Sequence, residues 1–128
     1  MAIRLKPTTV AVSPVLDALF DPLTVGAQEA VSIQLENLSA TETFTGYVRT
    51  RLDPGNGMAI STLGDLASVP PLGTLGPNGE DLSKVLVTAD VPANAELDVV
   101  GFMTGLGGDV RVTVLPRASR SIAMGMTR

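Results

Sequence analysis

The stretch from Leu75 to Val114 constrains the fold more than any other part of the chain. It contains three valine-rich segments in which apolar and polar residues nearly alternate, and turns rich in Pro, Asn, Asp and Gly separate them. Alternation with a period of two is typical of strands that bury one face, because successive side chains of a strand point to opposite sides. Short strands at this spacing predict a small antiparallel β-sandwich.

A strict alternation also occurs in the N-terminal half, over residues 29–36. The pattern predicts that Val31, Ile33 and Leu35 face the core and that the polar residues between them face water. Residues 43–52 form the next expected strand, and Gly46 interrupts its alternation, which favours a bulge. The expected core is therefore built from branched aliphatic side chains on several strands.

A short helical turn is predicted after a first strand over residues 8–12. Ser13 is a good helix cap, and Pro14 suits the first helical position because its missing N–H would be unpaired there anyway. Asp21-Pro22 would end the turn. The sequence therefore predicts a helical turn over roughly residues 14–20, plugging one end of the sandwich.

Two other segments have weaker signals. Residues 58–74 lack a regular pattern and contain Pro70-Pro71, so we expect a loop-rich crossing between sheets with at most short edge strands. The sequence GLGGD at residues 105–109 lies between two expected strands and no helix follows it, so it does not match a phosphate-binding loop. We interpret it as the tight turn of a hairpin.

The length, composition and net charge of the chain exclude several classes of protein. At 128 residues the chain is long enough for one domain with its own core. The hydrophobic fraction is 45% but aromatic residues make up only 3%, which argues against a surface that stacks sugars or unpaired bases. The net charge of −4 argues against binding to duplex nucleic acid. We find no signal peptide and no apolar stretch long enough for a membrane span, so no membrane partner is expected.

One domain over residues 1–128 is expected, with three parts. Residues 1–25 would form an N-terminal arm with the helical turn, and residues 26–116 the body of the sandwich. Residues 117–128 contain three arginines and no acid, and would form a basic tail or an edge strand.

The residues that most enzymes need are missing. The chain has no His and no Cys, which excludes histidine acid–base catalysis, thiolate chemistry and cysteine metal sites. No sequence matches a nucleophile elbow, a P-loop or a dinucleotide fingerprint. The acids are scattered over strand ends and turns without the spacing of a calcium loop, so we expect them to be solvated. No catalytic residue, metal ligand or cofactor is predicted, and we do not expect an enzyme.

Several segments together resemble bacterial and viral immunoglobulin-like domains. These segments are VSIQLEN at 31–37, TFTGYV at 43–48, LGPNGE at 75–80 and VTADVP at 87–92. The chain lacks the Cys, Trp, Cys pattern of vertebrate immunoglobulin domains. The resemblance implies an all-β fold, an antiparallel immunoglobulin-like β-sandwich, and implies no activity.

Among such domains the chain resembles the head decoration, or capsid cement, proteins of tailed phages. That resemblance implies a structural virion protein on the capsid exterior, synthesised in the host cytoplasm. Its partners would be the major capsid protein and other copies of itself, with a homotrimer favoured at three-fold lattice positions. The alternative is an adhesion or scaffold immunoglobulin-like module of a bacterial surface protein.

The two ends of the chain are the expected contact regions. An apolar N-terminal arm can add a strand to a neighbour's sheet, the C-terminal arginines can pair with acidic capsid residues, and methionines suit adaptable contacts. The candidate capsid or subunit contacts are Ile3, Arg4, Leu5, Val10, Val12, Arg117, Arg120, Met124, Met126 and Arg128.

Overall fold

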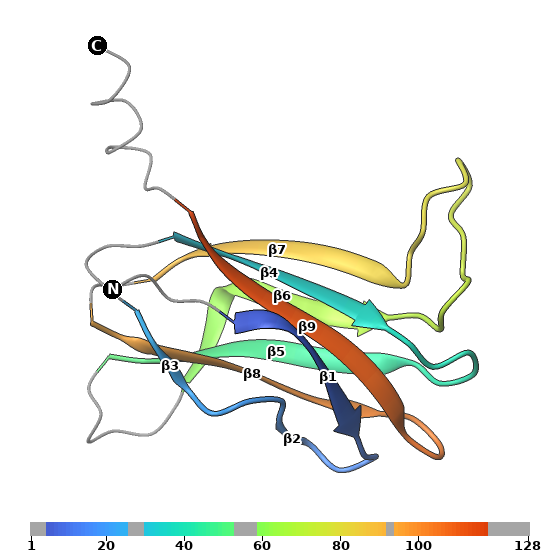
Figure 1. The fold of residues 1–128 in the computed structure, drawn as a ribbon, viewed down its shortest axis with the longest axis horizontal. Helices are drawn as coiled ribbons and strands as arrows, with labels where there is room; N and C mark the ends of the chain where they lie inside the picture. Colours follow the sequence, from blue (N-terminus) through green and yellow to red (C-terminus); the bar gives the residue numbers. More distant parts are fainter. Residues whose placement is uncertain (1–4, 26–29, 53–58, 92–93, 118–128) are drawn as a thin grey trace.

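The chain folds into two antiparallel sheets that pack as a sandwich (Figure 1). The structure, a computed structural model, describes residues 5–25, 30–52, 59–91 and 94–117. The first sheet has the order β1 (Leu5–Val12), β9 (Gly108–Arg117), β4 (Ala30–Asn37), β7 (Lys84–Asp90). The second has the order β2 (Asp17–Ala18), β8 (Glu96–Met103), β5 (Phe44–Arg51), β6 (Ala59–Val69), and β3 (Leu23–Thr24) also pairs with β8. The described residues include no helix that is long and apolar enough to cross a membrane.

The core lies between the sheets and consists mainly of aliphatic side chains. On β4, Val31, Ile33 and Leu35 are fully buried and the polar residues between them are half-buried, which confirms the face predicted from alternation. The opposite layer contributes buried side chains from β5 and β8, among them Phe44, Val48, Leu97, Val99 and Met103. Burial of these branched side chains is the main source of stability for such a fold.

Phe44 is the largest fully buried side chain among the described residues, and two glycines make room for it. Gly46 lies two residues along β5, and Gly101 lies directly opposite Gly46 on β8. A Cβ on Gly101 would lie 2.3 Å from Cζ of Phe44, and one on Gly46 would lie 2.6 Å from Cε2. The register between β5 and β6 also shifts after Gly46, as the interrupted alternation predicted.

The strand order is strongly non-local. The last strand of the described residues, β9, lies between β1 and β4, and it lies in a different sheet from β8, the strand before it. An immunoglobulin sandwich keeps its last two strands in one sheet. The all-β antiparallel class is therefore confirmed, whereas the expected immunoglobulin connectivity is not found.

The helical turn predicted over residues 14–20 is also not found. Asp17 and Ala18 instead form β2, opposite Gly101 and Val100 of β8, and the N–H of Leu19 donates to the carbonyl of Val99 at 2.8 Å. A single helical turn is marginal by itself, because its first hydrogen bond must fix several residues. Pairing with the open edge of β8 supplies hydrogen bonds that such a turn would lack.

The turn at residues 105–109 crosses between the sheets and does not close a hairpin. Gly105 and Gly107 have φ values of +55° and +80°, which an L-amino acid rarely adopts. A Cβ on Gly107 would also lie 2.6 Å from the carbonyl oxygen of Val12. The glycines thus let the chain pass close to the end of β1 and enter the first sheet beside it.

Residues 59–69 form one long strand where a loop-rich crossing was expected. Its pairing with β5 shifts register twice, between Gly46 and Tyr47 and again between Tyr47 and Arg49. Each shift interrupts the period-two pattern, because an unpaired residue changes which side the following residues face. A strand with such shifts cannot be recognised from regular alternation.

Candidate interaction surface

Four connecting loops meet at one end of the sandwich, the right-hand end in Figure 1. They are the β1–β2 loop (13–16), the β4–β5 loop (38–43), the β6–β7 loop (70–83) and the β8–β9 loop (104–107). We call this the loop end. Because each loop follows a strand that runs toward the same end, residues distant in sequence come together there.

Asn37 joins two of these loops. Its side chain is buried, and its Nδ2 donates to the carbonyl oxygens of Glu42 at 2.8 Å, Val69 at 3.1 Å and Pro70 at 3.1 Å. Its Oδ1 accepts from the N–H of Ser39 at 2.9 Å. One amide therefore ties the end of β4 and the β4–β5 loop to the start of the β6–β7 loop.

Thr104 fixes the β8–β9 loop to the β4–β5 loop. Its N–H donates to the carbonyl of Thr43 at 3.0 Å, and its Oγ1 accepts from the N–H of Thr43 at 2.9 Å. The same hydroxyl donates to Oε1 of Glu42 at 3.0 Å. On the other side, the N–H of Met103 donates to the carbonyl of Ser13 at 2.9 Å, which holds the β1–β2 loop. The loops therefore form one hydrogen-bonded framework.

The β6–β7 loop has a hairpin-like structure of its own. Leu75 and Asp81 form a bridge, and the N–H of Leu82 donates to the carbonyl of Thr74 at 2.9 Å. Asp81 Oδ1 accepts from Ser83, from the hydroxyl at 2.5 Å and from the N–H at 3.0 Å. These two bonds, the hydroxyl bond most of all, hold the pKa of the Asp81 carboxyl below its ordinary value, because they favour the ionised form.

This hydrogen-bonded end presents exposed apolar side chains. Leu106 is 96% exposed, Val15 71% and Leu75 64%. Leu16 and Leu72 on the same loops are also exposed. A single exposed apolar residue needs no explanation, but apolar residues on several converging, hydrogen-bonded loops are typical of a protein–protein contact.

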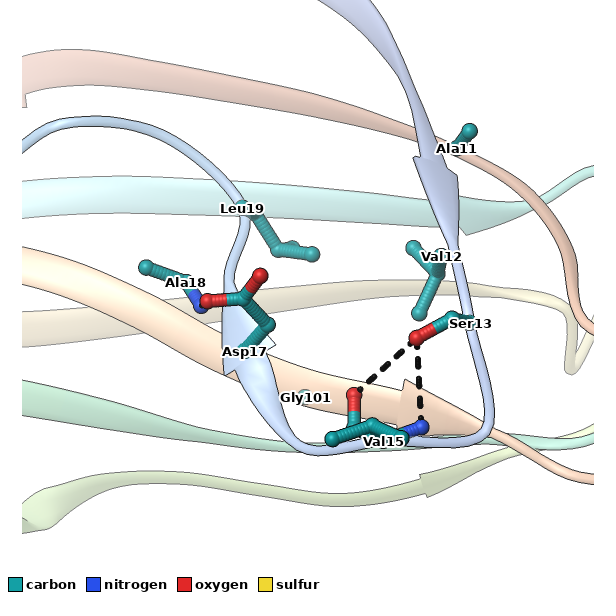
Figure 2. Close-up of a pocket in the computed structure, with 8 residues that line it drawn as sticks. All are labelled: Ala11, Val12, Ser13, Val15, Asp17, Ala18, Leu19 and Gly101. Carbon is teal, nitrogen blue, oxygen red and sulfur yellow. Dashed lines mark hydrogen bonds between the residues drawn. The ribbon is translucent and has the colours of Figure 1, made fainter.

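A small pocket of about 250 Å³ lies beside the β1–β2 loop (Figure 2). Ser13 shapes its rim, because Ser13 Oγ accepts from the N–H of Val15 at 3.2 Å. The residues around it are Ala11, Val12, Ser13, Val15, Asp17, Ala18, Leu19 and Gly101. Most are small or aliphatic, and the one carboxylate, that of Asp17, accepts from the N–H of Ala18 at 2.8 Å.

Two arginines of β5 pair with acids of β8 across the strands. Arg49 donates to both oxygens of the buried Asp98, at 2.9 and 2.7 Å, and these bonds raise the pKa of Arg49 above its ordinary value. Arg51 pairs with Glu96, and its Nε and Nη2 both donate to Oε1 of that residue. In the described residues no cluster of three or more acids is placed to hold a metal ion. These pairs tie β5 to β8, and we assign them a structural role.

The contact residues predicted at the termini lie partly within the sheet. Val12 is buried, and Leu5 and Val10 are half-buried and pack against the core of their own molecule. The backbone of Arg117 ends β9. The remaining candidates, Ile3, Arg4, Arg120, Met124, Met126 and Arg128, lie outside the described residues. The structure brings none of the described candidates into the loop end apart from Val12, which lines the pocket.

Sequence reasoning did not select the exposed loop residues. The sequence does contain a pattern that could have identified them, because Leu106 and Leu75 are apolar residues among turn-forming Gly, Pro and Asn. Turn geometry requires those neighbours but not a leucine. A leucine inside such a motif therefore marks a side chain that the turn holds out of the core.

Comparisons of the chain with protein-family models, with curated proteins and with solved structures found no match.

Proposed function

We propose that the chain is a structural virion protein that decorates and stabilises a phage capsid by binding the lattice of the major capsid protein. The mechanism is burial of surface, with no chemical step. The loop end is the proposed contact, and the observation that carries the proposal is its set of exposed apolar side chains on hydrogen-bonded loops, with Leu106 the most exposed. Loops that hydrogen bonds already hold in place have less entropy to lose on binding, which favours a stable contact.

The strand order supports the same proposal. Since β2 and β3 both pair with β8, they act as one interrupted strand, and the molecule has two facing sheets of four strands. Every connection except β5–β6 then crosses from one sheet to the other. We infer a jelly-roll relationship, an architecture used by viral capsid proteins and also by lectins. The two-layer sandwich is compatible with an immunoglobulin-like domain, whereas the order of the strands is not.

Binding to shells tests the proposal. Purified protein is mixed with undecorated capsids assembled from the major capsid protein of the same genome, and bound copies and resistance to rupture are measured. The wild type should bind at saturable sites and raise the force or temperature at which shells break. Leu106→Asp should weaken binding about tenfold or more, since a carboxylate in an apolar contact must lose its water.

Leu52→Asp is the matched control. Leu52 is 70% exposed, but it follows β5 at the opposite end of the sandwich. This variant should bind as the wild type does. Equal binding by both variants would move the contact away from the loop end, and no binding by the wild-type protein would refute the decoration role and favour the bacterial surface module.

A further inference from the structure

The two sheets leave four edges, and three of them carry features that discourage pairing. β1 contains Lys6 and Pro7 and a register shift between Leu5 and Thr8. The pairing of β6 with β5 shifts register twice, and β2 and β3 have two residues each. Short length, proline, lysine and bulges are the means by which sheet edges avoid pairing with other chains.

β7 is the least protected of the described edges, since its one lysine, Lys84, is its first residue. It has seven residues and no proline, and it pairs with β4 in unbroken register from Lys84 to Asp90. In Figure 1 it runs along the outer margin of its sheet. The described strands include none that pairs with its other side. An edge of this kind is a template for another strand.

The alternation of hydrogen-bonded and non-hydrogen-bonded residue pairs along β4 and β7 shows which backbone groups of β7 face this free side. The N–H of Asn37 donates to the carbonyl of Ser83 at 2.8 Å, so this opposed pair is a hydrogen-bonded one. Because such pairs alternate with non-bonded ones, Val85 and Val87 direct their N–H and C=O toward β4. The N–H and C=O groups of Lys84, Leu86, Thr88 and Asp90 point the other way, toward the free side.

The side chains of Val85, Leu86 and Val87 on β7 are incompletely covered. Val85 and Val87 face the core but remain half-buried at its margin. On the outer face of the sheet, Leu86 is 67% exposed. A neighbouring strand would cover the margin of the core and part of Leu86 in one step.

We propose that the β7 edge binds β7 of a second copy of this chain, antiparallel, around a two-fold axis at Val87. In this register Lys84 lies opposite Asp90 of the second copy, and Leu86 lies opposite Thr88 of the second copy. The basic start and acidic end of one strand thus match themselves. A two-fold contact demands such self-complementarity, which is why the proposed occupant is a second copy. The four-stranded sheets join into one continuous sheet of eight strands.

Cysteine cross-linking tests the register directly, since the chain has no cysteine of its own. The two copies of residue 87 form a non-hydrogen-bonded pair with Cα atoms about 4.5 Å apart, a spacing that a disulfide can bridge. Val87→Cys should therefore give a covalent dimer on mild oxidation. Val85→Cys, equally half-buried on the same strand, lies opposite residue 89 and should not. Equal cross-linking of both variants, or none by Val87→Cys, overturns the proposal.

A charge exchange provides a second, non-covalent test. Lys84→Glu and Asp90→Lys should each raise the dimer dissociation constant about tenfold at low salt, because two opposed pairs become repulsive. The double variant should restore it. Lys84 also lies 4.0 Å from Glu36 within its own chain, and Arg111 lies 3.3 Å from the same carboxylate. Arg111→Glu therefore controls for the loss of that internal contact and should leave dimerisation unchanged.

The mass in solution, measured by analytical ultracentrifugation without capsids, decides the stoichiometry. A dimer that dissociates on dilution supports the proposal. A monomer at all concentrations, or the trimer expected from the resemblance to decoration proteins, overturns it. Circular dichroism of each variant confirms that it remains folded. Because no capsid is present, this result is separate from the outcome of the decoration experiment.

Discussion

At the scale of single residues, Asn37 connects more of the loop end than any other described side chain. Its amide bonds three carbonyls, and that of Val69 is on a buried residue. Asn37→Ala removes these bonds and leaves buried acceptors unpaired, so the free energy of unfolding should fall by about 1–3 kcal/mol. Urea denaturation measures the change. Gln34→Ala, which removes one weak exposed-face bond of 3.4 Å, should cost less than about 0.5 kcal/mol.

Gly101 illustrates a residue whose role only the three-dimensional structure reveals. An added Cβ would meet the ring of Phe44 at 2.3 Å and the carbonyl oxygen of Thr45 at 2.7 Å. Gly101→Ala should therefore lower the free energy of unfolding by about 1–3 kcal/mol, because the ring or the strand must move. Gly76→Ala would meet only the flexible side chain of Glu80 and should change it less. Equal losses in thermal or urea unfolding would show that Phe44 does not limit this site.

At the scale of elements, β1 could serve as part of the sandwich of its own chain or as an arm that binds a neighbouring molecule. Its Val12 is buried, and its Leu5 and Val10 pack against the core, so it belongs to the sandwich of its own chain. Deleting residues 1–12 should abolish the cooperative unfolding transition, because it exposes that core and the edge of β9. Circular dichroism and the dispersion of amide NMR signals report this. Thr9→Ala, an exposed change, should keep the transition. A folded deletion variant that no longer binds capsids would instead establish an exchangeable arm.

Elements with regular alternation could be predicted from the sequence, and the others could not. The buried face of β4 follows directly from its period of two. The segment that became β6 gave no such signal, because shifts in its pairing with β5 interrupt the period. The segment around β2 has a good cap and a proline that favour a helical turn, yet the open edge of β8 captures it. Local sequence preferences determine the secondary structure of a segment only where no neighbouring strand edge offers hydrogen bonds to its backbone.

At the scale of the whole molecule, the pairing of strands and the proposed contact surface were beyond sequence reasoning. Neighbours in the chain usually pair, so β8 and β9 were expected to form a hairpin, but β9 pairs with β1 and β4. Nothing in the sequence of β9 identifies those partners, since its alternating valines would fit several positions. The loop end exists only as a result of this topology, because it joins four loops from separate parts of the chain. The sequence alone therefore could not show that the apolar residues of these loops lie at the same end of the molecule.

The central position of β9 also governs when the molecule can fold. Two of the three pairings in the first sheet involve β9, which lies between β1 and β4 and is the described strand latest in the sequence. Until β9 is available, the edges of β1 and β4 that pair with it stay open, whereas β4 can already pair with β7 and the second sheet contains no part of β9. Folding dominated by such long-range pairings is slow, and waiting intermediates are prone to aggregate. We therefore expect the first sheet to be completed only after residue 117 has been synthesised, and chaperones that shield unpaired strands to raise the yield of folded protein.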